Sequence, residues 1–362
     1  MQDKKIKVAL LGTSLAHGGA NKIHALYSLL FENQGFDVVN ILVNDDIDFP
    51  YGGKIIDLSP YKLGMFNRIK RFFLLRRFIK SERIDYLIDF RSRTKPMMEL
   101  ILKWFVFGNN YIPTVHSYEL DYYFPKNDFI SRLIYKNSLQ IVTVSKSIEE
   151  KVRLKYGFLN LVTIPNPIDS ADIIQKMTSP INITFPFIIA VGRMDEDNIK
   201  QFDLLLNAYA QSKLAEWGFH LIFLGDGILK GKLLIQAENL KLLDMVHFLG
   251  FKQNPYPYMN QARFLVLSSK NEGFPTVLNE ALACGTPVVS FDCESGPDEI
   301  IEHEVNGLLV ENQNFEALKD AMERMIVDTD LYSTCKKNAQ NRKDLHSFEQ
   351  IMEHWKAFLK VN

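Results

Sequence analysis

Two stretches, "KVALLGTSLAHGGANKIHALYSLL" at residues 7–30 and "FIIAVGRMDEDNIKQFDLLLNAYA" at residues 187–210, open the two halves of the chain in the same way. Each begins with a short apolar run, continues through a glycine into a loop, and ends in a helical pattern. A strand, a glycine-bearing turn and a helix in this order are typical of the start of a Rossmann-like domain. The repetition therefore predicts two such domains.

Short runs rich in Val, Ile and Leu alternate with longer helical patterns along the whole chain. This alternation predicts an α/β protein with parallel sheets covered by helices on both faces. Strands are expected at residues 7–11, 38–43, 86–89, 112–116, 141–144, 162–164, 187–191, 220–224, 246–249, 264–267, 287–290 and 308–310.

Four prolines and no long periodic run mark the stretch "IPNPIDSADIIQKMTSPINITFPF", which places a linker near residues 167–185. We expect an N-terminal domain over residues 1–170 and a C-terminal domain over residues 171–345. Apolar residues at helical spacing in 346–362 predict a terminal helix that packs back on the first domain. Open α/β sheets bind ligands at the carboxyl ends of their strands, so a site is expected where the two domains face each other.

The composition argues against some classes of function and favours one cellular compartment. The 42 basic and 43 acidic residues nearly cancel, so no overall field attracts nucleic acid. The three cysteines form no C-x-x-C pair, which argues against structural zinc and favours a reducing compartment. No secretory signal or run of about 20 apolar residues is evident, so a cytoplasmic protein is expected.

The stretch "NEGFPTVLNEALACG" predicts a helix over Pro275–Cys284, ended by Gly285. Its free amides would belong to Thr276, Val277 and Leu278. A helix N-terminus of this kind favours an anion, and a diphosphate suits it.

Two glutamates flank this helix start. Glu280 lies one turn beyond Thr276, and Glu272 precedes the helix in a loop. Carboxylates beside a phosphate site make electrostatic sense when they accept hydrogen bonds from sugar hydroxyls, and a nucleotide sugar carries hydroxyls on both sides of its diphosphate. The alternative is that Glu272 only favours the helix dipole and Glu280 is a solvated surface residue.

The chain resembles family 4 of the retaining, nucleotide-sugar-dependent glycosyltransferases, which have the two-domain GT-B fold. The resemblance runs in order through "GGANKIHAL", "VTVSKSIEEKV", "IPNPID", "AVGRMDEDNIKQFDLLLNAY", "LIFLGDG", "HFLGF", "SSKNEGFPTVLNEALACGTPVVS" and "SGPDEIIEHEVNGLLV". It covers nearly the whole sequence.

The resemblance implies a role for each matching residue. Glu272 would contact the donor sugar, Glu280 the ribose hydroxyls, and Arg193 with Lys200 the diphosphate. The basic pair would stabilise the departing nucleoside diphosphate without a metal. The remaining implied contacts are Gly18 and Gly19 near the donor phosphates, His116 beside the sugar, Gly250 and Phe251 at the nucleobase, and Gly273, Phe274, Pro275, Thr276 and Val277 around the donor.

The chain departs from the family at one point. The loop that carries Lys200 has two extra residues, and Gln201 stands where the family has glycine. Lys200 is therefore a less secure match than Arg193.

The resemblance further implies transfer of a hexose or N-acetylhexosamine with retention, no cofactor, a UDP-linked donor and an acceptor glycan that is lipid-linked. The leaving phosphate can take the acceptor proton, and the chain shows no nucleophile beside a general base. N-acetylhexosamines and galactose are the leading donors, for bacterial oligosaccharide, lipopolysaccharide or capsule assembly.

Other functions stay open. A metal-dependent transferase of the GT-A type would use Asp46 and Asp48 of "DDIDF", which is interpreted as a surface loop far from the other motifs. A nicotinamide-dependent oxidoreductase would explain the two openings, although neither contains G-x-G-x-x-G. A sugar-nucleotide epimerase of the same fold and a binding protein without turnover are further alternatives.

The run "YKLGMFNRIKRFFLLRRFIK", Tyr61–Lys80, has seven basic residues and no acidic one. It is either a patch that contacts an anionic membrane or an ordinary helix of the first domain. On a helical wheel its basic and apolar positions intermingle, which weakens an amphipathic anchor.

Overall fold

The computed structural model describes residues 5–61, 64–341 and 345–359. Its contacts divide the chain into two compact units. Unit 1 extends to Pro167 and resumes at Phe348, and unit 2 is Ile168–Ser347. The sequence placed these boundaries after residues 170 and 345, within a few residues of those observed. The stretch 167–185, expected to be a linker, contains the helix α6 (Ser170–Lys176), and all of it after Pro167 lies in unit 2.

Unit 1 is a seven-stranded sheet in the order β3-β2-β1-β4-β5-β6-β7, with all neighbouring strands parallel. Its elements are β1 (Lys7–Gly12), α1 (Gly19–Asn33), β2 (Asp37–Leu42), β3 (Lys54–Asp57), α2 (Met65–Ser81), β4 (Tyr86–Asp89), α3 (Pro96–Phe105), β5 (Tyr111–Val115), α4 (Asp128–Tyr135), β6 (Ile141–Thr143), α5 (Lys146–Tyr156), β7 (Leu161–Thr163) and α14 (Phe348–Lys356).

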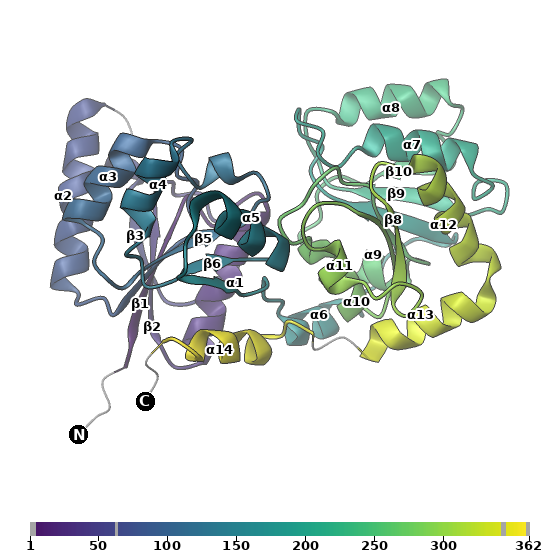
Figure 1. The fold of residues 1–362 in the computed structure, drawn as a ribbon. Helices are drawn as coiled ribbons and strands as arrows, with labels where there is room; N and C mark the ends of the chain where they lie inside the picture. The colour runs from purple at the N-terminus through teal and green to yellow at the C-terminus, as the bar shows by residue number, and fades with distance from the viewer. Residues whose placement is uncertain (1–4, 62–63, 342–344, 360–362) are drawn as a thin grey trace. The chain divides into compact units, whose positions relative to one another are not determined.

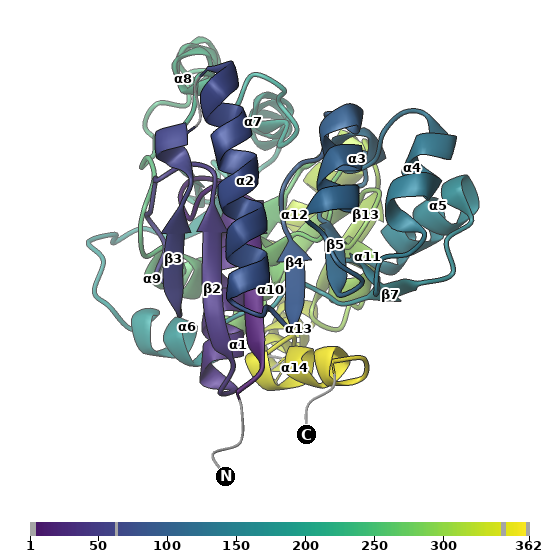
Figure 2. The same cartoon turned by 90° about the vertical axis from the view of Figure 1, so that its left-hand side faces the viewer.

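Helices cover both faces of this sheet. Right-handed connections that run in opposite directions along a sheet place their helices on opposite faces. The chain passes from β1 to β2 through α1, and returns from β3 to β4 through α2. Figures 1 and 2 accordingly show α2 and α3 on one side of the strands, and α1 with α14 on the other.

The edge strand β3 was not predicted. Its sequence, "KIID", is only four residues long, and its side chains are exposed or half-buried. It pairs with β2 through Val39 and Lys54. A short edge strand with charged ends has too weak an apolar pattern to be recognised.

The helix α14 packs on unit 1 through its apolar stripe. The Trp355 side chain is fully buried, and its ring lies edge-on to Tyr27 at 5.5 Å and Phe31 at 5.4 Å, both on α1. Residues 360–362 of the expected terminal helix lie outside the described residues. The C-terminal segment is thus part of the same core as the first β-α-β unit.

Unit 2 is a six-stranded parallel sheet in the order β10-β9-β8-β11-β12-β13. Besides α6, its elements are β8 (Phe187–Val191), α7 (Phe202–Gln211), β9 (His220–Leu224), α8 (Lys230–Asn239), β10 (Val246–Phe248), α9 (Tyr256–Gln261), β11 (Leu265–Leu267), α10 (Thr276–Ala283), β12 (Val288–Asp292), α11 (Pro297–Ile300), β13 (Gly307–Glu311), α12 (Phe315–Val327) and α13 (Thr329–Asn341).

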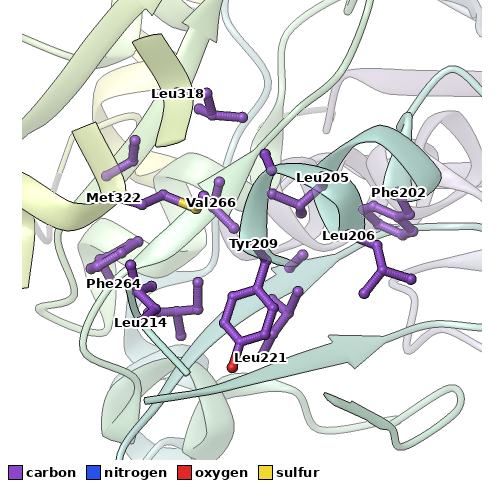
Figure 3. Packing of buried hydrophobic residues seen from close by; sticks show 14 of the residues in the cluster. Phe202, Leu205, Leu206, Tyr209, Leu214, Leu221, Phe264, Val266, Leu318 and Met322 are labelled. Atoms are coloured by element: carbon purple, nitrogen blue, oxygen red, sulfur yellow. The ribbon is translucent and has the colours of Figure 1, made fainter. Parts of the chain in front are cut away.

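The core of unit 2 forms between α7, α12 and the sheet. Leu205 and Tyr209 on α7 point into the same cluster as Leu318 and Met322 on α12 (Figure 3). The Tyr209 hydroxyl donates to the Phe219 carbonyl at 2.7 Å, so this buried ring keeps its polar end satisfied. The three cysteines are free, buried thiols.

Candidate active site

Each sheet has one topological switch point, where neighbouring strands lead into connections that run in opposite directions. In unit 2 this point lies between β8 and β11. Ligands of open α/β sheets bind at the carboxyl ends of the strands at such a point. The loops that follow β8 and β11 carry Arg193, Lys200 and Glu272, so the fold brings these predicted residues to one edge of the sheet.

Lys200 and Glu272 form an ion pair across the switch point. Their Nζ and Oε1 atoms are 2.5 Å apart, and the two side chains are 23% and 13% exposed. The Glu272 amide donates to the Glu294 carbonyl at 3.2 Å, which fixes the carboxylate-bearing loop to the loop after β12. A backbone contact between two loops thus positions the carboxylate of the pair.

The Lys200 stem packs over glycine. A side-chain carbon at Gly192 would lie 3.0–3.2 Å from three carbons of the lysine stem, so a larger residue would displace the stem. The Ser268 hydroxyl donates to the Lys200 carbonyl at 2.7 Å. Arg193 differs: its side chain is 64% exposed, and its guanidinium pairs with Asp195 at 2.6 Å. Lys200, the less secure match by sequence, is the more buried of the two cations.

Gln201 adopts a left-handed conformation, with φ 49° and ψ 41°, at the start of α7. This explains why the resembling family has glycine here, because only glycine adopts that region without steric cost. The Gln201 side-chain amide exchanges two hydrogen bonds with that of Gln313, at 2.8 and 2.9 Å. The pair offsets the backbone cost and anchors the loop that carries Lys200.

A glycine at position 201 should be tolerated better than an alanine. Both Gln201→Gly and Gln201→Ala lose the bonds to Gln313, but only alanine keeps the left-handed strain of about 1 kcal/mol. We expect the glycine variant to melt about 2–4 °C above the alanine variant in thermal denaturation. Equal melting temperatures, or a more stable alanine variant, would contradict the assignment of strain to this position.

The helix α10 starts one residue later than predicted. Pro275 is the N-cap residue rather than the first helical residue, and Cys284 is the C-cap. The Leu278 amide donates to the Pro275 carbonyl at 3.0 Å, so it is not available to a ligand as predicted. Among the described residues, the amides of Thr276 and Val277 have no backbone partner. Gly285 ends the helix with φ 72°, as expected.

Glu280 is not a solvated surface residue. Its side chain is 5% exposed, on the same helix that begins beside Glu272. The preceding turn is equally ordered: the Ser295 hydroxyl donates to the Gly273 carbonyl at 2.5 Å, and Phe274 is buried. The turn before the helix is therefore packed and hydrogen-bonded to the loop after β12.

Three glycines that follow neighbouring strands meet at the same edge. The Gly225 amide donates to the Gly250 carbonyl at 2.9 Å, and a side chain on Gly225 would lie 1.9 Å from the Gly192 carbonyl oxygen. These residues follow β9, β10 and β8, respectively. Phe251, next to Gly250, is 62% exposed. An exposed aromatic ring beside a glycine turn suits contact with a nucleobase.

In unit 1 the switch point lies between β1 and β4. Gly18, with φ 88°, and Gly19 begin α1 after the loop that follows β1. Asn21, which was not predicted as a site residue, holds this loop together through its side chain. Its Nδ2 donates to the Ser14 hydroxyl at 3.0 Å and to the Ala16 and His17 carbonyls at 2.6 and 2.9 Å. An Asn soon after a Gly-Gly pair was its only sequence signal.

The acidic loop "DDIDF" was wrongly placed far from the other motifs. Leu15 forms a parallel bridge with Ile47, and its amide donates to the Asp46 carbonyl at 3.0 Å. The Asp48 carboxylate lies 3.1 Å from Nδ1 of His17. The loop is thus packed beside the glycine loop of unit 1, a pairing between distant segments that no local pattern encodes.

His116 follows β5 at the same edge of unit 1. Its Nε2 is 2.8 Å from the Thr114 hydroxyl, which itself donates to the Asp89 carbonyl at 2.9 Å. A hydroxyl has one proton, so the Nε2–H of His116 donates to Thr114. Burial, together with the nearby Arg93 guanidinium, lowers the pKa of His116 to about 3. The imidazole is therefore neutral at physiological pH.

Buried charged residues at the end of β4 and just after it form hydrogen bonds beneath His116, and they were not predicted from the sequence. Asp89 and Arg93 are fully buried. Asp89 accepts two hydrogen bonds from the Arg91 side chain, at 2.9 and 2.8 Å, and the positive charge of Arg91 and Arg93 lowers the carboxyl pKa against the effect of burial. Arg93 donates to the Thr114 carbonyl at 2.8 Å. The signal was present in "DFRSR", charged residues directly after an apolar strand.

Two parallel α/β units, each with its loops gathered at a switch point, have the architecture of the GT-B fold. The solved structure of HepE from Anabaena in complex with UDP shares the fold, with a TM-score of 0.75 and 18% identity over 98% of this chain and 99% of that one. A sequence profile described as "Glycosyl transferases group 1" matches residues 173–342.

Two curated relatives extend the comparison to both units. One from Campylobacter jejuni, N-acetylgalactosamine-N,N'-diacetylbacillosaminyl-diphospho-undecaprenol 4-alpha-N-acetylgalactosaminyltransferase, is 30% identical over 93% of this chain and 94% of its own. A second, GalNAc-alpha-(1->4)-GalNAc-alpha-(1->3)-diNAcBac-PP-undecaprenol alpha-1,4-N-acetyl-D-galactosaminyltransferase from the same organism, is 27% identical over 80% and 78%. The chain belongs to the group 1 glycosyl transferases, the family 4 type.

Proposed function

We propose that this glycosyltransferase moves a hexose or N-acetylhexosamine from a UDP-sugar to a lipid-linked glycan, forms an α-glycosidic bond with retention, and needs no metal or other cofactor. The observation that carries the proposal is the Lys200–Glu272 pair at the switch point of unit 2. Lys200 lies on the loop after β8, and Glu272 lies on the loop that leads into α10, where the amides of Thr276 and Val277 have no backbone partner among the described residues.

The donor side follows from charge. A nucleoside diphosphate carries anionic oxygens that suit Lys200, Arg193 and the start of α10. Glu272 would accept from hydroxyls of the transferred sugar and Glu280 from those of the ribose, while the exposed ring of Phe251 would contact the base. UDP is the proposed nucleotide because the HepE structure of the same fold holds UDP.

The chemistry requires one bond exchange at the anomeric carbon. The bond from that carbon to the diphosphate oxygen breaks, and a bond to the acceptor oxygen forms on the same face. The acceptor proton passes to the departing phosphate oxygen, so no enzymatic base is consumed. Lys200 and Arg193 stabilise the negative charge that develops on the leaving group. The resemblance assigns the Gly18–Gly19 turn to the donor phosphates and the neutral His116 to the transferred sugar.

The acceptor proposal rests on the named relatives. Both Campylobacter proteins carry undecaprenol in the names of their substrates and transfer N-acetylgalactosamine. An N-acetylhexosamine is therefore the first donor sugar to test. Within the described ranges, no helix is long and apolar enough to cross a bilayer. We propose that the protein works in the cytoplasm and reaches its acceptor from the membrane surface, with residues 61–80 in contact with anionic lipid; Lys62 and Leu63 lie outside the described residues.

A donor screen tests the function. We expect UDP and one UDP-N-acetylhexosamine to raise the melting temperature by several degrees at about 100 times their Kd, because such binding adds about 2.7 kcal/mol to stability. GDP and NADH should shift it much less. Stabilisation by NADH alone would indicate the oxidoreductase alternative, and a new UDP-sugar in place of a glycosylated acceptor would indicate an epimerase.

A further inference from the structure

Helix α2 is rich in apolar residues but contributes little to the core. Among its described side chains only Leu75 is buried, whereas Phe66 is 83% exposed and Phe73 60% exposed. Large apolar side chains normally leave water when a domain folds. A helix that keeps two phenylalanines in solvent therefore offers a surface for something other than its own sheet.

The neighbouring helix α3 repeats this arrangement. Met97 is 70% exposed and Trp104 64%, while Glu99 on the same helix is buried. Phe105 joins the two helices, since its ring lies 6.5 Å from that of Phe72 on α2. Figures 1 and 2 show α2 and α3 on one side of the sheet. We call this surface the α2–α3 face, formed by Phe66, Ile69, Phe73, Met97, Trp104 and Phe105.

The charges around this face have one sign. Helix α2 contains no acidic residue and has six basic ones, Arg68, Lys70, Arg71, Arg76, Arg77 and Lys80. The only acidic residue of α3, Glu99, is buried and paired with Arg91 at 3.2 Å. The Arg76 guanidinium lies 5.8 Å from the centre of the Phe105 ring, so cationic and aromatic groups are interleaved. This combination matches the interface of an anionic bilayer, where aromatic rings sit at headgroup depth and cations meet lipid phosphates.

We infer that the α2–α3 face docks unit 1 on the surface of an anionic lipid bilayer, with Trp104 inserted at headgroup depth. The inference extends the contact from residues 61–80 to α3, and it rests on the proposed function in that it brings the enzyme to a lipid-linked acceptor. A second copy of the chain fits the face less well. A two-fold interface would set the same basic residues of both copies against each other, which costs stability.

Tryptophan fluorescence tests the insertion directly. The other two tryptophans are Trp217 and Trp355, and Trp355 is fully buried. In a Trp217→Phe variant, vesicles of phosphatidylcholine with about 30% phosphatidylglycerol and brominated chains should quench the emission. Adding Trp104→Phe should remove the quenched component. Unchanged emission of the Trp217→Phe variant on these vesicles would overturn the inference.

Sedimentation with vesicles tests the charges and the partner. Neutralising Arg76→Gln and Arg77→Gln should weaken binding to the anionic vesicles about 10- to 30-fold. The control Ile235→Ser removes a side chain of unit 2 that is 60% exposed and should not change binding. Equal binding of all variants, or a dimer that shields Trp104 without lipid, would contradict the bilayer assignment. The vesicle assays contain no sugar nucleotide, so they do not depend on catalysis. A protein that binds the vesicles but transfers no sugar would therefore contradict the proposed function and leave the bilayer inference intact.

Discussion

Glu272→Ala is expected to lower kcat for sugar transfer by at least about 100-fold while the protein stays folded and still binds UDP. The carboxylate is needed where hydroxyls of the transferred sugar are held, not where the diphosphate binds. In the free protein it pairs with Lys200 at 2.5 Å, so its removal also frees that lysine. UDP should therefore bind the variant at least as tightly as it binds the parent protein.

The stability cost of this change should be small. Loss of a partly exposed ion pair is worth about 1 kcal/mol, which shifts the melting temperature by a few degrees. Glu294→Ala is a matched control, because this exposed glutamate lies on the loop whose carbonyl accepts from the Glu272 amide. Its transfer rate should stay within about twofold of the parent rate. A folded Glu272→Ala enzyme with near-normal turnover would refute the role given to this carboxylate.

Lys200→Met is expected to have the opposite profile: weaker UDP binding together with a loss of about 100- to 1,000-fold in kcat/KM. Methionine retains much of the stem that packs over Gly192 but removes the charge that would stabilise the leaving diphosphate. The loss of affinity can be measured by titration with UDP, and the loss of rate with the donor identified in the screen. A chelator should leave the parent rate within about twofold, because two cations replace a metal.

Lys232→Met provides the comparison for Lys200→Met. Lys232 is an exposed lysine on α8, and its substitution should change neither UDP affinity nor rate. If Lys200→Met binds UDP as tightly as the parent protein, the lysine serves only to orient Glu272. A double variant with Glu272→Ala separates these cases, since coupling between the two residues makes their effects non-additive.

Much of the fold could be predicted from local pattern. Strands such as Phe187–Val191 and Tyr86–Asp89 are apolar runs between helical segments, and buried parallel strands have this appearance. The strand Lys54–Asp57 was not predicted, because a strand at the edge of a sheet needs few apolar residues. The helix α6 was not predicted, because it is short and lies between prolines.

The residues of the candidate site were proposed from the sequence, but their arrangement could not be. The motif around Glu272 and the basic residues Arg193 and Lys200 were recognised in sequence, and so was Gly285 as a helix end. Their pairing was not, because the Lys200–Glu272 contact joins residues 72 positions apart. The proline motif likewise concealed that Leu278 bonds to Pro275 and leaves only two amides at the helix start.

From the sequence alone, the periodicity of apolar residues predicted the strands and helices. The glycines and charged residues directly after the predicted strands then indicated which residues could take part in chemistry. Only the tertiary structure decided what those residues face. The strand order places β8 beside β11, which brings Lys200 to Glu272, and it packs the loop of Asp46 and Asp48 beside the glycine loop of unit 1. Burial decided the rest, because the charge of His116 and the exposure of Trp104 depend on which side chains surround them, and distance along the chain does not encode that.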